Sequence, residues 1–342
     1  MTSEKSPQKL RLKVLEVIHE TGDAHSIVFE KPDGIAYKPG QFLTLRLPHA
    51  DGPVARCYSL SSAPDVDPHL KVTIKRVKDG RGSNWVCDEV LAGHEIDVLA
   101  PSGTFTPRNL DTDLLLLAGG SGVTPVMSII KSSLAKGTGR MLLVYANRDE
   151  QSVIFHAELR ALVAEHPERL VVLHWLETVQ GLPSIRPLQE IVRPWAHSEA
   201  FICGPAPFMD CAADALKELG VSRDRIHIER FTSLAGDPWT EVEAAPAVAG
   251  ERTVDLVVEL DGEVHELDWP VSQKLLDFLL DKGLDAPYSC REGACSACGL
   301  KLIEGEVSMD VNSVLEQQDL DEGWRLACQS RPVSDAVKVA YD

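Results

Sequence analysis

The sequence predicts a multidomain protein in which an antiparallel β-barrel is followed by an α/β domain with a parallel sheet and then by a small α+β domain. Three observations lead to this prediction. The 342 residues are enough for about two or three domains of ordinary size. The hydrophobic pattern changes near residue 110 from short, closely spaced strands to apolar strands that alternate with helices. Four cysteines are gathered in the last third of the chain.

Residues 1–108 contain short segments rich in Val, Ile, Leu and Thr, several of which alternate apolar with polar residues. Turn sequences such as KPDG, KPG and ADGP separate these segments. Closely spaced antiparallel strands of this kind favour a small barrel or sandwich. The predicted strands are at residues 10–20, 24–30, 41–48, 55–60 and 69–77.

Residues 109–233 begin with the continuous apolar run DLLLLAGG, which leads through glycines into a helical stretch. Strand and helix then alternate as far as the segment RIHIERF. This alternation is typical of a parallel sheet that helices cover on both faces. Strands are predicted at 113–120, 140–147, 169–177, 199–205 and 225–231, and helices at 124–137, 153–167, 185–195 and 207–220.

Residues 234–252 show no hydrophobic period and are rich in Ala, Pro, Gly and Glu, which indicates an interdomain linker. The final domain, residues 253–342, has two predicted strands, a helix and a loop with three cysteines. A further strand (299–307), a short helix and a last strand complete it. We therefore expect a small α+β domain at the end of the chain.

The charge of the chain limits its partners and its location. A net charge of −18 leaves no basic surplus to displace counterions from nucleic acid. From residue 251 onward there are 20 acidic and 8 basic residues, a net −12, which leaves −6 for the first 250. This excess serves either solubility or docking to a basic partner. Without a membrane-length apolar run or a secretory pattern, we expect a cytoplasmic protein, whose cysteines are ligands or core thiols rather than disulfides.

Cys290, Cys295 and Cys298 lie in the stretch SCREGACSACGL, and Cys328 follows 30 residues later. Zinc sites usually take their ligands from two close C-x2-C pairs, and here only one pair has that spacing. The spacing C-x4-C-x2-C with a distant fourth cysteine is that of plant-type 2Fe–2S proteins. Small residues between the cysteines allow backbone N–H groups to approach the sulfides: Gly293, Ala294, Ser296 and Ala297. The loop is predicted to hold a 2Fe–2S cluster rather than zinc or a disulfide.

With these cysteines in place, residues 253–342 resemble a plant-type ferredoxin domain of the β-grasp fold. The resemblance implies that Cys290 and Cys295 bind the outer iron and that Cys298 and Cys328 bind the inner one. Clusters of this type take one electron at a time at about −400 mV. An electron source is then needed elsewhere in the chain.

The stretch LLLLAGGSGVTPVMSII places a glycine turn between a strand and a helix. Bare glycines let backbone N–H groups approach a pyrophosphate, whose charge the helix N-terminus favours. The turn lacks the full G-x-G-x-x-G spacing, so by itself it leaves dinucleotide binding open. The residues expected to bind in this turn are Gly120, Gly122 and Thr124.

Two further segments resemble the ferredoxin–NADP reductase superfamily: ARCYSLSS its R-x-Y-S signature and FICGPAPFM its C-G-P turn. The resemblance implies that Arg56 neutralises the FAD pyrophosphate, that Tyr58 lies against the isoalloxazine and ribityl chain, and that Ser59 hydrogen-bonds flavin N5. A cation, a polar-tipped ring and a small hydroxyl suit these tasks. The other FAD residues that it implies are Leu60, Thr73, Ile74 and Lys75 near the ring, and Gly82, Ser83, Asn84 and Trp85 near the phosphates.

On the nicotinamide side, the resemblance places Cys203, Gly204 and Pro205 of the C-G-P turn near the nicotinamide. Cys203 is otherwise an ordinary buried thiol at a strand end. Phe231 either shields the flavin, as an aromatic residue does in related reductases, or is a core phenylalanine.

The choice between NADH and NADPH depends on the segment YANRDEQSVIF, where Arg148 precedes Asp149 and Glu150. An acid suits a free ribose hydroxyl, whereas arginines suit a 2′-phosphate. One arginine beside two acids favours NADH over NADPH.

These parts form an electron path. NADH delivers two electrons as a hydride, a 2Fe–2S cluster accepts one, and a flavin can take two and release them singly. Hydride transfer needs no general base or nucleophile, so no catalytic residue is predicted.

The domain order resembles that of reductases of the phenylacetyl-CoA epoxidase type. The segments VARCYSL, LHWLETVQGLPS and VNSVLEQQDLDEGWRLACQSRP further resemble the reductases of bacterial 3-ketosteroid 9α-hydroxylases. This resemblance implies a Rieske-type terminal oxygenase of steroid and cholesterol breakdown as the electron acceptor. Two alternatives stay open: the reductase of another oxygenase, such as a di-iron epoxidase, and a non-catalytic redox-sensing or zinc-binding interaction protein.

Overall fold

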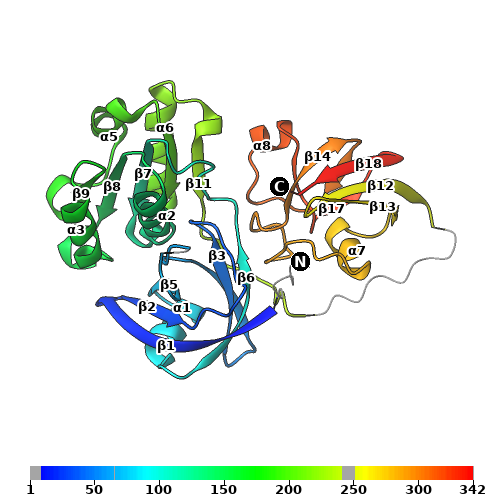
Figure 1. Cartoon of the computed structure of the whole chain (residues 1–342), viewed down its shortest axis with the longest axis horizontal. Coiled ribbons are helices and arrows are strands. Elements are labelled where there is room, and N and C mark those ends of the chain that lie inside the picture. Colours follow the sequence, from blue (N-terminus) through cyan, green and yellow to red (C-terminus); the bar gives the residue numbers. More distant parts are fainter. Residues whose placement is uncertain (1–8, 65, 241–250, 342) are drawn as a thin grey trace. The chain divides into compact units, whose positions relative to one another are not determined.

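The computed structural model describes residues 9–64, 66–240 and 251–341. The chain divides into two compact units, the first with residues up to 52 and 56–231, the second with residues 53–55 and those from 232 onward. Figure 1 draws the barrel of the first unit in blue and cyan and its α/β part mainly in green. Residues 241–250 of the predicted linker lie outside the described residues.

The first unit begins with a six-stranded antiparallel sheet in the order β4-β3-β6-β1-β2-β5. A bridge between Leu60, directly after β4, and Val72 in β5 links the two edge strands, so the sheet closes into the predicted barrel. The strands are β1 (Lys9–Thr21), β2 (Ala24–Phe29), β3 (Phe42–Leu47), β4 (Val54–Ser59), β5 (Leu70–Lys75) and β6 (Glu95–Ser102).

Two elements of the barrel domain are absent from the sequence prediction. The helix α1 (Arg81–Glu89) has no side-chain N-cap and no acidic residue in its first turn, so the usual start signals are missing. The strand β6 carries Pro101, a residue that argues against a strand inside a sheet. Tertiary packing stabilises both, since Val86 of α1 and Val98 of β6 are buried.

The first unit continues with a five-stranded parallel sheet in the order β11-β10-β7-β8-β9. The chain runs outward from β7 to β9 and then returns to β10 on the other side of β7. The strand order therefore reverses between β7 and β10, which is the switch point of an open α/β sheet. The strands are β7 (Leu114–Gly119), β8 (Met141–Asn147), β9 (Leu170–Leu176), β10 (Glu199–Cys203) and β11 (Ile226–Glu229).

Helices cover both faces of this sheet, as predicted. Leu116 of β7 packs with residues of α2 and α3 in one buried cluster, and Leu115 packs with residues of α5 and α6 in another. The helices are α2 (Val123–Lys136), α3 (His156–Glu165), α4 (Glu177–Gln180), α5 (Ile185–Val192) and α6 (Ala206–Glu218), with short 3-10 turns η1 (Gly120–Gly122), η2 (Glu150–Ser152), η3 (Arg193–Trp195) and η4 (Arg223–Arg225).

The second unit is the expected α+β domain, with a five-stranded sheet β13-β12-β18-β14-β16 and a two-stranded sheet β15-β17. The predicted strand at 299–307 is in fact two strands in different sheets, because the chain turns at Gly305, whose φ is +85°. The elements are β12 (Thr253–Leu260), β13 (Glu263–Pro270), α7 (Leu275–Asp281), β14 (Gly299–Glu304), β15 (Val307–Met309), α8 (Gln317–Asp321), β16 (Trp324–Leu326), β17 (Ser330–Pro332) and β18 (Ala336–Ala340).

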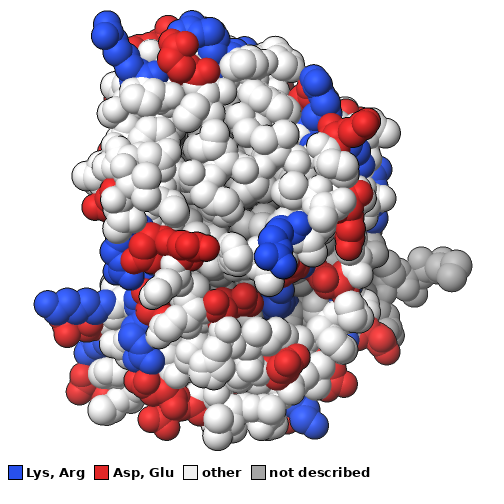
Figure 2. Space-filling view, turned by 90° about the vertical axis from the view of Figure 1, so that its left-hand side faces the viewer, with Lys and Arg blue, Asp and Glu red and all other residues white. Residues whose placement is uncertain are grey.

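The charge of one face and the length of the helices bear on possible partners and on membrane insertion. On the face drawn in Figure 2, lysines and arginines are interspersed with acidic side chains, and neither sign gathers into a broad patch. Within the described ranges, no helix combines the length and the apolar character needed to cross a bilayer.

Candidate functional site

The structure brings three predicted FAD residues together. A Cβ atom on Gly82 would lie 2.9 Å from Cγ of Arg56 and 3.2 Å from the hydroxyl oxygen of Tyr58, so glycine is needed at this contact. Gly82 is in the first turn of α1, where backbone N–H groups lack partners within the helix and the helix dipole is positive. A guanidinium beside a helix N-terminus fits a pyrophosphate. These residues therefore fit the phosphates of FAD.

The two residues that follow Gly82 also stabilise the start of α1. The hydroxyl of Ser83 accepts a hydrogen bond from the Val77 amide at 3.1 Å, and Oδ1 of Asn84 accepts one from Arg76 at 3.3 Å. The Asn84 amide donates to the Gly80 carbonyl. Trp85 is partly buried on the same helix. The predicted phosphate-binding segment is thus a helix turn with its own internal contacts.

Thr73 and Ile74 of β5 were both predicted to line the flavin ring. Consecutive side chains of a strand point to opposite faces, so these two side chains do not face one ring together. The Thr73 hydroxyl is buried and shares hydrogen bonds with Ser26 at 2.7 Å and Ser61 at 2.9 Å. Ser59 and Leu60, at the end of β4, are buried as well.

The end of β5 lies against the glycine turn of the α/β domain. The Nζ atom of Lys75 is 4.0 Å from the position that a Cβ on Gly120 would take, and it forms an ion pair with Asp23 at 3.7 Å. Gly120 has a φ of +52°, which glycine adopts at little cost. The strand β5, which is predicted to contact the flavin, therefore lies next to the glycine turn, which is predicted to bind the dinucleotide.

The glycine turn and the C-G-P turn meet at the switch point of the parallel sheet. A Cβ on Gly122 would lie 2.1 Å from the Cys203 carbonyl oxygen and 2.7 Å from the Gly204 nitrogen. The Thr124 hydroxyl donates to the Ser121 carbonyl at 3.0 Å, which closes the turn before α2. Ligands of open α/β sheets bind beyond the strand ends at this point, next to a helix N-terminus. The two turns therefore fit a dinucleotide.

Glu229 is a residue of this region that the sequence prediction did not assign to the site. It is the register partner of Cys203 across β11 and β10. Burial raises the pKa of Glu229 to about 7, and burial together with nearby Glu229 raises the pKa of Cys203 well above its ordinary value. An acid at the end of the short strand IHIE was the available signal. Phe231, two residues further on, is 48% exposed and is therefore not a core residue.

Arg148 and Asp149, the residues meant to distinguish NADH from NADPH, pair with each other. Nε of Arg148 lies 2.9 Å from Oδ2 of Asp149, and this contact lowers the pKa of Asp149. The Asp149 carboxylate also accepts the Ser152 amide at 2.9 Å as the N-cap of η2. Because the two charges are joined, this geometry selects neither nucleotide.

The four predicted iron ligands lie together in the second unit, and all are buried. The Cys290 sulfur contacts those of Cys295 and Cys328, and Cys328 also contacts Cys298. These sulfur contacts, together with amide donors of the loop, lower the pKa of Cys290. All eight cysteines, each among the described residues, are free thiols.

The loop around the cysteines has the close backbone approach that a cluster needs. The amides of Cys290 and Glu292 point at the sulfurs of Cys295 and Cys290, each at 3.5 Å. Gly293 has a φ of +75°, and a Cβ there would lie 2.6 Å from the Val311 carbonyl oxygen. Amide donors to buried sulfurs stabilise thiolates and cluster sulfides. The loop fits a 2Fe–2S cluster.

Gln329, which follows Cys328 in the sequence, forms hydrogen bonds to the cysteine loop. Its side-chain amide lies 3.5 Å from the Cys328 sulfur and 3.1 Å from the Arg291 carbonyl, while its oxygen accepts from Lys274 at 2.9 Å.

Across the described ranges, no three His, Cys, Asp or Glu side chains converge as one metal ion requires. The four thiols form a chain of contacts in the order Cys295, Cys290, Cys328 and Cys298. A two-iron cluster shares its cysteines between two metal atoms.

Family models match all three parts of the chain. They are an oxidoreductase FAD-binding domain over residues 10–106, an oxidoreductase NAD-binding domain over 116–214 and a 2Fe-2S iron-sulfur cluster binding domain over 258–333. Among solved structures, phthalate dioxygenase reductase has the same fold, with a TM-score of 0.59 and 24% identity over 97% of this chain and 98% of that chain.

Several curated proteins are similar over nearly their whole length. The ferredoxin reductase component of 3-ketosteroid-9-alpha-monooxygenase from Mycolicibacterium smegmatis is 56% identical over 97% of each chain. That of Rhodococcus rhodochrous is 52% identical over 96% of each, and one component of the 1,2-phenylacetyl-CoA epoxidase of Escherichia coli is 32% identical over 97% of each. The chain therefore belongs to the family of ferredoxin reductase components of monooxygenases, oxidoreductases that join an FAD-binding, an NAD-binding and a 2Fe–2S domain.

Proposed function

We propose that this chain supplies electrons from NADH to a Rieske-type terminal oxygenase that hydroxylates 3-ketosteroids at position 9α. The observation that carries the redox part is the contact between β5 and the glycine turn, where Lys75 approaches Gly120. This contact supports the proposal because a strand predicted to contact the flavin and a turn predicted to bind the dinucleotide belong to one compact unit. The steroid part rests on the 56% identity to the Mycolicibacterium smegmatis protein.

When bound, FAD accepts a hydride from the nicotinamide and releases electrons singly, which suits the one-electron capacity of a 2Fe–2S cluster. The residues of the chain bind and orient these groups. Arg56 and the first turn of α1 would hold the FAD pyrophosphate, and Gly122 and Gly204 let the two turns pack closely at the switch point, where the nucleotide would bind. The four cysteines would hold the cluster, and no side chain is required as a general base.

The second unit would meet the oxygenase. It contains the whole segment from residue 251 onward, whose 20 acidic and 8 basic residues give a net charge of −12. A field of this sign steers a basic docking face and weakens with added salt. The free state of all eight cysteines supports work in a reducing cytoplasm.

The test combines the purified holoprotein with NADH or NADPH and one of two oxygenases, a 3-ketosteroid 9α-hydroxylase or a phenylacetyl-CoA epoxidase. We expect hydroxylated steroid with NADH and the first oxygenase, at a rate that falls as salt rises. Product only with the epoxidase would transfer the chain to the second candidate, which the 32% identity to the Escherichia coli protein supports. Faster turnover with NADPH would contradict the nucleotide assignment.

A further inference from the structure

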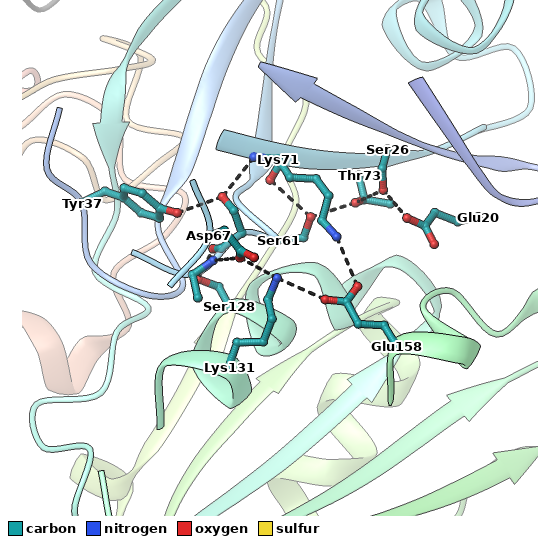
Figure 3. Close-up of polar contacts among 12 residues, drawn as sticks. Glu20, Ser26, Tyr37, Ser61, Asp67, Lys71, Thr73, Ser128, Lys131 and Glu158 are labelled. Atoms are coloured by element: carbon teal, nitrogen blue, oxygen red, sulfur yellow. Dashed lines mark hydrogen bonds and ion pairs between the residues drawn. The ribbon is translucent and has the colours of Figure 1, made fainter. Parts of the chain in front are cut away.

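A charged cluster joins the barrel to the α/β domain within the first unit. Its members are Asp67 and Lys71 from the barrel and Lys131 and Glu158 from the α/β domain, and we call it the interdomain charge cluster (Figure 3). Lys131 Nζ lies 2.6 Å from Asp67 and 3.2 Å from Glu158, and Lys71 Nζ lies 3.2 Å from Glu158. Two of these ion pairs, Lys131 with Asp67 and Lys71 with Glu158, join a residue of the barrel to a residue of the α/β domain.

Lys131 is the unusual member of this cluster. It is 7% exposed, and among the described residues no other Lys, Arg, Asp or Glu is buried to this degree. A buried ammonium group is costly unless carboxylates face it, so its position is tied to Asp67 and Glu158. Displacing one domain would separate Lys131 from Asp67 and Lys71 from Glu158, which leaves Glu158 of its own domain as the remaining carboxylate partner of the buried ammonium group, whereas an apolar contact tolerates sliding. The cluster thus favours one placement of the two domains.

Hydrogen bonds continue from the cluster to β5, the strand predicted to contact the flavin. Ser128, one turn before Lys131 on α2, donates to the Ser62 carbonyl at 2.6 Å, and the Ser62 hydroxyl accepts from the Lys71 amide at 3.0 Å. The neighbouring Ser61 bonds the hydroxyl of Thr73 in β5 at 2.9 Å. Figure 3 labels Ser128, Lys71, Ser61 and Thr73, which belong to this set of hydrogen bonds. The other end of β5 meets Gly120 through Lys75.

We propose that the interdomain charge cluster, with the Ser128–Ser62 hydrogen bond, sets the position of the nicotinamide on the flavin. The helix α2 follows directly on the glycine turn, and β5 carries the predicted flavin contacts, so fixing one against the other fixes the donor and acceptor atoms. Hydride transfer is sensitive to this distance: a displacement of about 1 Å can cost about a hundredfold in rate. Lys131 is in this view a positioning residue, and the inference rests on the proposed transfer from NADH to FAD.

The test is flavin reduction by NADH in the holoprotein under anaerobic stopped flow, with NADH deuterated at C4 as a second substrate. Lys131→Met should lower the limiting rate about tenfold or more and change the isotope effect, while the Kd for NADH changes little. Arg140→Met is the matched control, because it breaks an exposed pair with Asp113 at 2.8 Å in the same domain. It should reduce at the wild-type rate.

Two further variants separate positioning from folding. Ser128→Ala removes one hydrogen bond without leaving a buried charge, and should lower the limiting rate by a smaller factor with FAD content unchanged. Asp67→Asn removes the carboxylate that crosses the domain boundary and leaves Glu158 facing Lys131, so it should lower the limiting rate less than Lys131→Met does. A wild-type rate and isotope effect in both Lys131→Met and Ser128→Ala would overturn the proposal. If the wild-type flavin is not reduced by NADH, the proposed function itself fails. The oxygenase assignment does not enter this assay.

Discussion

Replacing Glu229 by glutamine tests whether this carboxyl group is held protonated at neutral pH. Burial raises its pKa from 4.5 to about 7. Because the folded protein favours the protonated form, the contribution of this group to stability is fully present below pH 4.5 and is lost as the pH rises through 7. A shift of two to three units at 1.36 kcal/mol each corresponds to about 3 kcal/mol. The side chain is partly exposed, so water screening makes this an upper limit.

Glutamine has no charge at any pH, so the Glu229→Gln variant should not lose this part of its folding stability as the pH rises. The stability gap between variant and wild type should widen from below about 1 kcal/mol at pH 5 to at most about 3 kcal/mol at pH 8. For a unit of this size, 3 kcal/mol corresponds to a Tm difference of about 6–12 °C, which differential scanning calorimetry resolves.

Asp113→Asn provides a control of opposite sign. Its carboxylate has a lowered pKa because Arg140 donates a hydrogen bond to it. Its contribution is therefore present at neutral pH and is lost as the pH falls through the folded pKa, so Asp113→Asn should lower Tm at pH 8. A gap between Glu229→Gln and wild type that stays constant from pH 5 to pH 8 would refute the reasoning.

Three other variants test the cofactor sites. Gly122→Ala puts a Cβ 2.1 Å from the Cys203 carbonyl and should abolish NADH binding in calorimetric titration, whereas Gly22→Ala, with open space around it, should bind normally. Cys328→Ser should remove the cluster absorbance and about two irons per chain while the FAD content persists; full iron occupancy would exclude this cysteine as a ligand. Arg56→Met should lower the FAD content of the purified protein, because it removes the cation expected at the pyrophosphate; unchanged FAD affinity would reject that role.

Local sequence was sufficient wherever a function is built from one continuous segment. The spacing of Cys290, Cys295 and Cys298 is set by one loop, which supplies three of the four sulfurs, and the fourth comes from Cys328, 30 residues later. Alternation of apolar strands with helices likewise predicted the parallel sheet, because a strand buried on both faces must be continuously apolar. The glycine turn could also be predicted from the sequence, because the strand end, the turn and the start of the helix lie in one continuous stretch.

Prediction failed where packing outweighs local preference. The helix α1 lacks start signals, and β6 contains a proline, yet both form because they bury apolar side chains against the barrel. By contrast, the preference for NADH drawn from Arg148 and Asp149 stays a prediction, and only the fold shows that these two side chains pair with each other.

The sequence by itself determined the three cofactor-binding types and their order along the chain, because each depends on residues a few positions apart. Only the tertiary structure decided which distant residues meet. Lys131 becomes a buried ion-pair partner of Asp67, 64 positions away, and Glu229 acquires its raised pKa beside Cys203. Desolvation and charge pairing depend on what surrounds a group in space, and that environment is created when the strands and helices pack.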